Sequence, residues 1–369
     1  MATSITGVSS VSFWVKPTSI TTVGFMDFDG GTHKISVSSG TISATGFTLP
    51  TIYVNGVVSS TLVANSWQYV TVTTGTAITA NAIRFGRISS TSLTGKLDSI
   101  SIFNYARTAA QVAWDYNRGA PVGWWKMDEC QGTTANDSSG NGNTGTITVG
   151  GSGTQTAVGT CTASATTMWY TGRTGKYNSS LNFDGTDDYV DMGNVSSLNF
   201  DKTSSFTLST WIKTNSTTGF PTFLGKLQNS PRTGYGIYLV NSGVGTVGGV
   251  GFTITNSSGN AIEVRGSINV ANNNWHHIVV TYSGSSAASG VKIYTDGILN
   301  TNSTVTDALS SATTSTASFQ VGAFNNGSQP FTGQIDDPRI YNYPLTVTQI
   351  KTLYNGGGAV RYGPVTGSP

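Results

Sequence analysis

Short runs in which apolar and polar residues alternate recur along the chain, as in residues 67–72 (WQYVTV) and 206–213 (FTLSTWIK). Alternation with a period of two is typical of a β-strand that buries one face. Turn residues such as Asn55-Gly56 separate the runs, and Asn-Gly strongly indicates a hairpin. Because the runs are many and short and no long helix is indicated, the pattern predicts an all-β fold of antiparallel sheets packed as sandwiches.

The end of the chain repeats a pattern found near residue 100. Residues 94–119 (TGKLDSISIFNYARTAAQVAWDYNRG) and 332–356 (TGQIDDPRIYNYPLTVTQIKTLYNG) each begin with a strand-like stretch and continue into a short helical pattern. Thr108 and Thr346 precede the helical patterns, and each stands three residues before a Gln, which is the spacing of a capping box. A repeat of this length predicts two related domains that end in the same way.

The repeat also sets the predicted domain boundaries. We expect the first domain to span residues 1–119 and the second to span residues 120–369, including a short C-terminal tail. The match extends to the tripeptides at 14–16 and 211–213, but residues 122–200 have no counterpart in the first half. The first domain is therefore predicted to be either a shortened variant or one that lacks its front. We interpret the chain as a fragment of a larger protein.

Charge and apolar content narrow the choice of partners and location. Asp, Glu, Lys and Arg make up 10% of the 369 residues and the formal net charge is +2, whereas a typical soluble domain has about 25% charged residues. No basic cluster with interleaved aromatic residues occurs, so nucleic acid is not expected as a partner. No apolar run reaches the length of about 18 residues that indicates a membrane span. The abundance of Gly, Ser, Thr and Asn predicts an extracellular or cell-surface protein.

Two cysteines, Cys130 and Cys161, lie within the predicted second domain. They flank a segment rich in Gly, Thr and Ser. A disulfide between them agrees with the extracellular type of composition and would contribute about 3–4 kcal/mol by closing the loop. The alternative is two unpaired thiols.

Seven segments of the second half follow one another in an order known from one protein family: 124–129 (WWKMDE), 136–145 (NDSSGNGNTG), 180–190 (SLNFDGTDDYV), 206–213 (FTLSTWIK), 274–282 (NWHHIVVTY), 291–297 (VKIYTDG) and 333–355 (GQIDDPRIYNYPLTVTQIKTLYN). Through them the second half resembles a LamG-type domain of the concanavalin A-like lectin/glucanase superfamily. The first half resembles the same family through fewer motifs. The resemblance implies two jelly-roll β-sandwiches in tandem, the first shortened.

Some relatives of this fold are retaining glucanases, which use two closely placed carboxylates, typically in a Glu-x-Asp-x-Glu pattern. This chain has two glutamates, Glu129 and Glu263, and neither lies in that pattern. The neighbours His276 and His277 fall on one predicted strand and point to opposite faces. We therefore expect no catalytic residues and a non-enzymatic protein.

Calcium is the metal that the sequence favours, because Ca²⁺ takes about six to eight oxygen ligands from carboxylates, amides and carbonyls. The resemblance implies a calcium that joins the first and last strands of the second domain through Asp128 or Glu129 and Asp336 or Asp337. The alternative is that these acidic and amide residues are turn residues that cap their own backbone. In the first domain Ser99 replaces Asp337, so a site is less expected there. The candidate ligands are Asp128, Asp137, Asn141, Asp184, Asp187, Asp336 and Asp337.

A sugar site needs exposed aromatic faces and hydrogen-bonding amides or carboxylates. Tryptophans within alternating strands, such as Trp14 and Trp211, are assigned to the core. The candidate residues in predicted loops are Trp169, Tyr170, Tyr235, Phe324, Asn325 and Asn326.

Together these patterns predict a non-enzymatic extracellular fragment that binds carbohydrate or mediates adhesion, with a glycan or a surface protein as its ligand. One alternative is a structural spacer, or a filament or pilus-like subunit, whose copies self-associate through the sheet edge of the first domain. Another alternative is an ancillary module of a carbohydrate-active enzyme.

Overall fold

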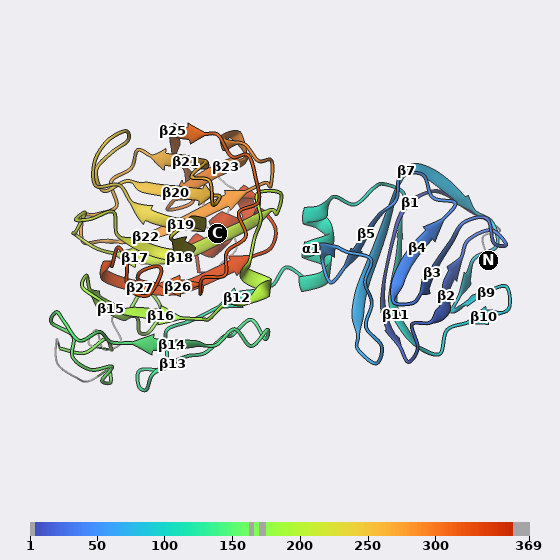
Figure 1. Ribbon diagram of the computed structural model, residues 1–369, viewed down its shortest axis with the longest axis horizontal. Coiled ribbons are helices and arrows are strands. Elements are labelled where there is room, and N and C mark those ends of the chain that lie inside the picture. The colour runs from blue at the N-terminus through green and yellow to red at the C-terminus, as the bar shows by residue number, and fades with distance from the viewer. Residues whose placement is uncertain (1–3, 162–165, 170–174, 357–369) are drawn as a thin grey trace, which may run out of the picture. The chain divides into compact units, whose positions relative to one another are not determined.

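The computed structural model describes residues 4–161, 166–169 and 175–356, and the chain divides into two compact units (Figure 1). Unit 1 comprises Met1–Ala120 and unit 2 comprises Pro121–Pro369. The predicted residue Tyr170 lies outside the described residues. Each unit has its own hydrophobic core, so each is described by itself.

Unit 1 is a sandwich of two antiparallel sheets with strand orders β11-β1-β7-β5-β6 and β4-β3-β2-β8, and β9 and β10 form a small ribbon. Inward side chains of the two sheets meet in the core, where the rings of Phe13 and Phe25 lie 5.8 Å apart. The strands are β1 (Ile5–Pro17), β2 (Thr22–Asp27), β3 (Lys34–Ser38), β4 (Thr41–Thr45), β5 (Thr51–Val54), β6 (Val57–Val58), β7 (Gln68–Ala80), β8 (Arg84–Phe85), β9 (Arg87–Ile88), β10 (Thr91–Ser92) and β11 (Gly95–Phe103).

Unit 2 is a larger sandwich. One sheet has the order β12-β27-β17-β22-β23-β24, with β15 also paired to β27, and the other has the order β13-β14-β16-β26-β18-β19-β20-β21-β25. The rings of Phe206 and Tyr235 meet between the sheets, 5.0 Å apart. The predicted all-β sandwich architecture is therefore confirmed. The first elements are β12 (Gly123–Trp124), β13 (Thr134–Ala135), β14 (Gly145–Thr148), β15 (Leu181–Asp184), β16 (Tyr189–Asp191), the 3₁₀ turn η1 (Ser196–Leu198), β17 (Phe206–Lys213), β18 (Thr222–Asn229) and β19 (Arg232–Leu239). The remaining strands and second 3₁₀ turn are β20 (Val250–Thr255), β21 (Ala261–Gly266), β22 (Trp275–Tyr282), η2 (Ala288–Gly290), β23 (Val291–Thr295), β24 (Ile298–Leu299), β25 (Thr301–Asp307), β26 (Gln320–Val321) and β27 (Thr332–Tyr341).

The repeated segments form the same structure in both units. Strand β11 lies beside β1 as β27 lies beside β17, and each pairing is interrupted by a bulge next to Trp14 or Trp211. The bulges place Ser99 (φ 50°) and Asp337 (φ 54°) in the left-handed region. Helices α1 (Ala109–Asn117) and α2 (Val347–Tyr354) follow, and both predicted capping boxes are confirmed.

One hydroxyl fixes the end of the closing strand in each unit. The Ser10 hydroxyl donates to the carbonyl of Tyr105 (2.9 Å) and accepts from the backbone N–H two residues further on (2.8 Å). The Thr207 hydroxyl does the same with the carbonyl of Tyr343 (2.8 Å) and the N–H of Leu345 (2.9 Å). The repeat seen in the sequence is thus a repeated structural joint.

The predicted disulfide between Cys130 and Cys161 is confirmed, with an S–S distance of 2.04 Å. It closes a loop of unit 2 across a sequence separation of 31 residues, for which loop-closure entropy gives about 3–4 kcal/mol of stabilisation.

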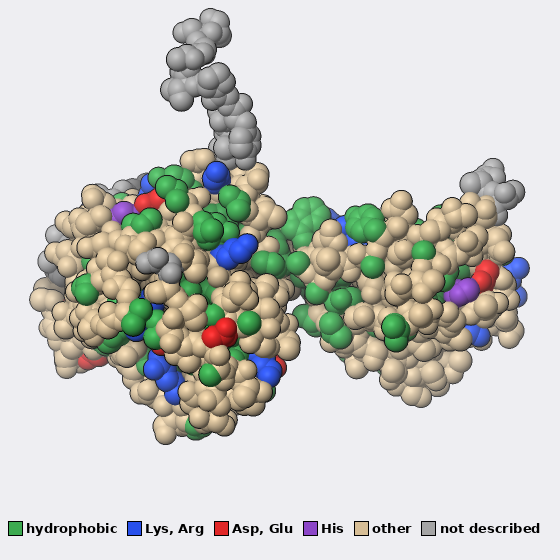
Figure 2. All heavy atoms as spheres, turned by 90° about the horizontal axis from the view of Figure 1, so that it is seen from above, with side chains coloured by type: hydrophobic (Ala, Val, Ile, Leu, Met, Phe, Trp, Pro, Cys, Tyr) green, Lys and Arg blue, Asp and Glu red, His purple; other side chains and the backbone are tan. Residues whose placement is uncertain are grey.

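Charged side chains are sparse on the surface, in agreement with the composition. The face shown in Figure 2 is mostly the tan of polar uncharged side chains and backbone, with a few blue and red groups. Across the described part of the chain, no helix has both the length and the apolar content that crossing a membrane would require.

The joint makes a stability prediction. Replacing Thr207 with Val leaves the buried N–H of Leu345 without its acceptor, so we expect the free energy of unfolding of unit 2 to fall by about 1–3 kcal/mol. Thr207→Ser keeps the hydroxyl and is the matched control. Urea denaturation of both variants tests the expectation, and equal stability of the Val and Ser variants would contradict it.

Candidate functional site

The aromatic residues predicted as sugar platforms in loops are buried instead. Trp169, Tyr235 and Phe324 are 0%, 1% and 2% exposed. The Trp169 indole donates to the carbonyl of Gly132 (3.1 Å) and the Tyr235 hydroxyl donates to the carbonyl of Leu198 (2.6 Å). Their assignment as stacking residues is therefore wrong, because the sandwich encloses their ring faces.

The two asparagines of that prediction form a turn. Asn325 and Asn326 both have left-handed backbones, with φ of 46° and 59°. The backbone N–H of Asn326 donates to the side-chain oxygen of Gln320 (3.0 Å), and its own side-chain oxygen accepts from the Gln320 amide (3.2 Å). Through these hydrogen bonds Asn326 stabilises the turn. The neighbouring ring of Phe324 is buried, so it offers no exposed face to a sugar.

Among the predicted metal ligands, Asp137 and Asn141 already have protein partners. Asp137 accepts from the backbone N–H groups of Trp124 (3.0 Å), Ser139 (2.9 Å) and Asn143 (2.9 Å). The Asn141 amide donates to the carbonyl of Val122 and to the hydroxyl of Ser139. Both act as turn residues that cap the local backbone.

The acidic hairpin of Asp184, Asp187 and Asp188 is wrapped by residues 150–155. The loop donates N–H groups to Asp184 (2.6 and 2.9 Å), Asp187 (3.0 Å) and Asp188 (3.2 Å). Burial raises the pKa of Asp188 to about 6, and the neighbouring charges of Asp184 and Asp187 act in the same direction. The amides of the loop thus hydrogen-bond to these carboxylates in place of water, except at Asp187 Oδ1, which is buried without a partner.

Asp336 is a buried carboxylate, and the charges of Asp128 and Asp337 act on its pKa. Its Oδ2 accepts from the N–H of Tyr177 (2.7 Å), and its Oδ1 is buried without a partner. Burial raises the pKa of Asp336 to about 8, and the charges of Asp337 and Asp128 add to that rise.

Asp337 is occupied by donors, because it accepts from the Trp124 indole (2.5 Å) and pairs with Arg339 (2.7 Å). Within residues 4–161, 166–169 and 175–356, no group of three or more His, Cys, Asp or Glu side chains is arranged to hold a metal. Among the predicted ligands, Asp336 Oδ1 and Asp187 Oδ1 are buried without a partner, and the charge of Asp128 acts on Asp336.

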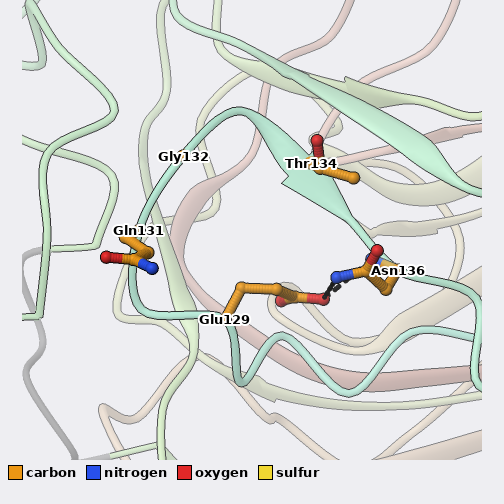
Figure 3. Close-up of a pocket in the computed structure, with 5 residues that line it drawn as sticks. All are labelled: Glu129, Gln131, Gly132, Thr134 and Asn136. Carbon is orange, nitrogen blue, oxygen red and sulfur yellow. Dashed lines mark hydrogen bonds between the residues drawn. The ribbon is translucent and has the colours of Figure 1, made fainter.

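A polar hollow of about 570 Å³ lies beside the disulfide in unit 2 (Figure 3). Glu129 and Asn136 face each other across it, and the Glu129 carboxylate accepts from the Asn136 backbone N–H (2.7 Å) and side-chain amide (3.1 Å). Its lining residues are Glu129, Gln131, Gly132, Thr134 and Asn136. This lining offers hydrogen bonds but no aromatic face.

Unit 1 contains a pocket of about 280 Å³ that combines aromatic faces with polar groups. We call it the aromatic pocket. It lies on the outer face of the five-stranded sheet, because Trp14 alternates with the core residues Phe13 and Val15 along β1. The lining residues are Trp14, Tyr69, Ser99, Ser101, Phe103, Trp114, Asp115 and Arg118.

The floor of the aromatic pocket consists of packed aromatic rings. The ring of Trp14 lies 5.3 Å from that of Tyr69 and 5.8 Å from that of Tyr116, which belongs to α1. Trp114 is 44% exposed. Asp115 pairs with Arg107 through Oδ1, while its Oδ2 is buried without a partner. An exposed indole and the side chains of Asp115 and Arg118 thus line the same pocket.

Unit 2 has the same aromatic stack without the pocket. There Trp211 stacks with Tyr354 at 5.6 Å and with His277 at 4.9 Å, but it is only 1% exposed. Lys176 places Nζ 3.9 Å from the centre of the Trp211 ring, and Tyr177 packs edge-on at 6.0 Å.

The remaining volume in unit 2 is taken by large side chains. Asp337 and Arg339 stand where unit 1 has Ser99 and Ser101, and the Arg339 guanidinium lies 4.4 Å from the centre of the Trp124 ring. In unit 1 the two small residues Ser99 and Ser101 line the pocket at these positions. Trp14, which the alternation pattern assigned to the core, instead lines this pocket on the outer face of the sheet.

The aromatic stack predicts a pH dependence of stability. Burial lowers the pKa of His277 to about 3, and the positive charge of Arg339 lowers it further. In the unfolded chain the ring takes up a proton near pH 6.5, so stability is lost as the pH falls below that value. Unit 2 of the wild type should lose unfolding free energy as the pH falls from 6 to 4. We expect this loss to be smaller in His277→Gln, by up to about 1.4 kcal/mol per pH unit.

Urea denaturation at several pH values measures this slope. His276→Gln is the control, because that imidazole lies at the strand end with a hydrogen bond to Asp296 (2.7 Å). An unchanged slope in His277→Gln would show that His277 does not control the acid response.

Comparison with known proteins connects unit 2 to one family. Residues 184–351 match the model of the family described as the concanavalin A-like lectin/glucanases superfamily. A search of curated protein sequences found no match.

Several solved structures resemble the chain at low identity. The binding domain of Paraclostridial Mosquitocidal Protein 1 is 15% identical, with a TM-score of 0.46 over 65% of this chain and 53% of that chain. Domain 4 of AbnA, a GH43 extracellular arabinanase from Geobacillus stearothermophilus, is 22% identical, with a TM-score of 0.43 over 64% of this chain and 98% of that chain. The botulinum neurotoxin serotype D binding domain is 14% identical, with a TM-score of 0.44 over 66% of this chain and 52% of that chain. This chain thus spans about half the length of the two toxin binding domains.

The family match covers the sheets of unit 2 from the end of β15 into α2. Its last part is the closing strand and helix that unit 1 repeats. Residues 184–351 of unit 2 are thus similar to the concanavalin A-like lectin/glucanase superfamily.

Proposed function

We propose that this chain is a non-catalytic carbohydrate-binding protein and that the aromatic pocket of unit 1 holds the sugar. The observation that carries the proposal is a pocket that is lined by the exposed indole of Trp114 together with the polar side chains of Asp115 and Arg118. A pyranose presents an apolar C–H face, which an indole covers, and hydroxyl groups, which donate to a carboxylate. At about 280 Å³ the pocket has room for one or two sugar rings rather than for a long chain.

The fixed partners of the two glutamates support a non-catalytic role. Glycoside cleavage uses a pair of carboxylates on either side of the bond. Glu129 is held by Asn136, and Glu263 accepts from the Tyr238 hydroxyl and pairs with Arg265 (2.7 Å). Glu263 therefore serves a buried hydrogen-bond network rather than an open cleft.

The disulfide and the low charge support an extracellular or cell-surface location, where thiols oxidise and a glycan ligand would be met. In that setting the chain acts in adhesion, or as the ancillary module of a carbohydrate-active enzyme. The two roles share one sugar site and differ in the polypeptide attached to it.

A glycan array followed by titration of the strongest glycan tests the proposal. We expect Trp114→Ala to weaken binding at least about tenfold, which corresponds to about 1.4 kcal/mol. Trp67→Ala is the matched control, because Trp67 is 42% exposed in the same unit but does not line the pocket. A blank array, or equal binding by both variants, would overturn the proposal and favour a structural spacer.

We also propose that Asp336 and Asp128 are calcium ligands. The buried, unpartnered oxygen of Asp336 supports this, since a cation would satisfy it and remove the need for a proton. We expect calcium to raise the melting temperature relative to EDTA, because a ligand at about 100 times its Kd adds about 2.7 kcal/mol. Asp336→Asn should melt at the same temperature in both conditions. A wild-type protein that ignores calcium would contradict the site.

A further inference from the structure

Unit 2 contains a lysine whose side chain points into the sandwich. Lys226 of β18 lies directly opposite Tyr235 of β19, and the two residues are 0% and 1% exposed. Directly opposite residues share one face of a sheet, and Tyr235 belongs to the hydrophobic core, where its ring lies 6.4 Å from that of Phe319. A lysine is almost never fully buried unless it is paired, so the partners of its amine need an explanation.

Those partners are two neutral oxygens. Nζ of Lys226 donates to the side-chain oxygen of Asn194 (2.6 Å) and to the backbone carbonyl of Ala317. Because a C=O bond is about 1.2 Å long, Nζ lies at most about 3.8 Å from Cγ of Asn194. Atoms that are arranged to react lie about 3–3.5 Å apart. The amine and the amide carbon therefore need only a small shift, and a turn of the amide plane, to reach that arrangement.

Burial also favours the reactive form of the amine. It lowers the pKa of Lys226 to about 8, although the negative charge of Asp191 acts in the opposite direction. Asp191 is itself held by the backbone N–H of Gly193 (2.6 Å) and by the side-chain amide of Gln320 (3.2 Å). A neutral amine is a nucleophile, whereas an ammonium group is not. A fraction of the molecules therefore carries a nucleophile beside the amide of Asn194 near neutral pH.

The backbone on both sides of the contact is held in place. Met192 and Gly193, which precede Asn194, exchange hydrogen bonds with the backbone of Phe319 (3.0 Å each). Lys226 lies in the middle of β18, which is paired with β19. Asn194 itself is exposed, so a small molecule released from its amide can reach solvent.

We propose that Lys226 and Asn194 join in an intramolecular isopeptide bond. The neutral Nζ attacks Cγ of Asn194, a C–N bond forms, and the bond between Cγ and Nδ2 breaks. The proton that Nζ loses goes to Nδ2, which leaves as ammonia, so the reaction needs no oxidant and no further reactant. The product has no buried positive charge and keeps one N–H on Nζ for the carbonyl of Ala317.

The bond links the segment after β16 to β18 across a sequence separation of 32 residues. It gives unit 2 a second covalent cross-link in addition to the disulfide. Unlike the disulfide, it is not cleaved by reducing agents.

Mass spectrometry of the intact, reduced full chain tests the proposal. We expect the wild type to be lighter than its sequence by the mass of one ammonia, and Asn194→Ala and Lys226→Gln to have the full masses of their sequences. Because Asn194 is exposed, Asn194→Ala should fold normally. Asn215→Ala is the matched control, since Asn215 is also exposed in unit 2, and it should still lose ammonia.

Trypsin locates the bond, because it cuts after Lys and Arg but not after a lysine whose amine is bonded. An unlinked chain yields separate peptides of residues 177–202 and 214–226, whereas a linked chain yields one species that joins residues 177–202 to 214–232. A wild type with its full mass would overturn the proposal. A lighter wild type whose two peptides stay separate would also overturn it, since the ammonia would then come from a cyclic imide at an asparagine.

Discussion

A buried hydroxyl holds the closing strand of each unit against the strand that carries the stacked tryptophan. Ser10 and Thr207 make the same two hydrogen bonds, and without them a carbonyl and an N–H would lose their partners away from water. This joint fixes where the closing strand ends and where the helix begins. The bulge and the capping box then place Tyr116 or Tyr354 over the tryptophan.

The two units share this joint but differ in the strands and side chains that cover it. In unit 2, β12 and β15 cover the edge of β27, and Lys176 and Tyr177 cover the face of Trp211. Among the described residues of unit 1, β11 pairs with β1 alone, and a pocket lies over Trp14. In unit 2, strands and side chains thus cover the positions that correspond to β11 and Trp14 of unit 1.

Covering the joint has an electrostatic consequence. The low dielectric beneath α2 and the segment at Tyr177 disfavours charge, so the pKa of Asp336 rises to about 8 and that of His277 falls to about 3, in both cases chiefly through burial. The smaller and more open face of unit 1 has Asp98 and Tyr69 at these places. Unit 2 therefore concentrates the buried groups whose protonation affects stability, whereas unit 1 has the aromatic pocket.

The sequence by itself determined the strand-rich architecture, the duplication, the capping boxes and the disulfide partners, because alternation, repetition and short-range spacing are local properties of the chain. It did not determine which face of each strand lies inward. Alternation places Trp14 and Phe13 on opposite faces but does not say that the face of Trp14 stays open. It also left Trp169 and Tyr235 as loop candidates, although packing encloses both. Asp115 and Ser99 come from different elements and meet only when α1 folds over the sheet. Burial and the meeting of distant residues depend on how the sheets pack, so only the tertiary structure decided the site.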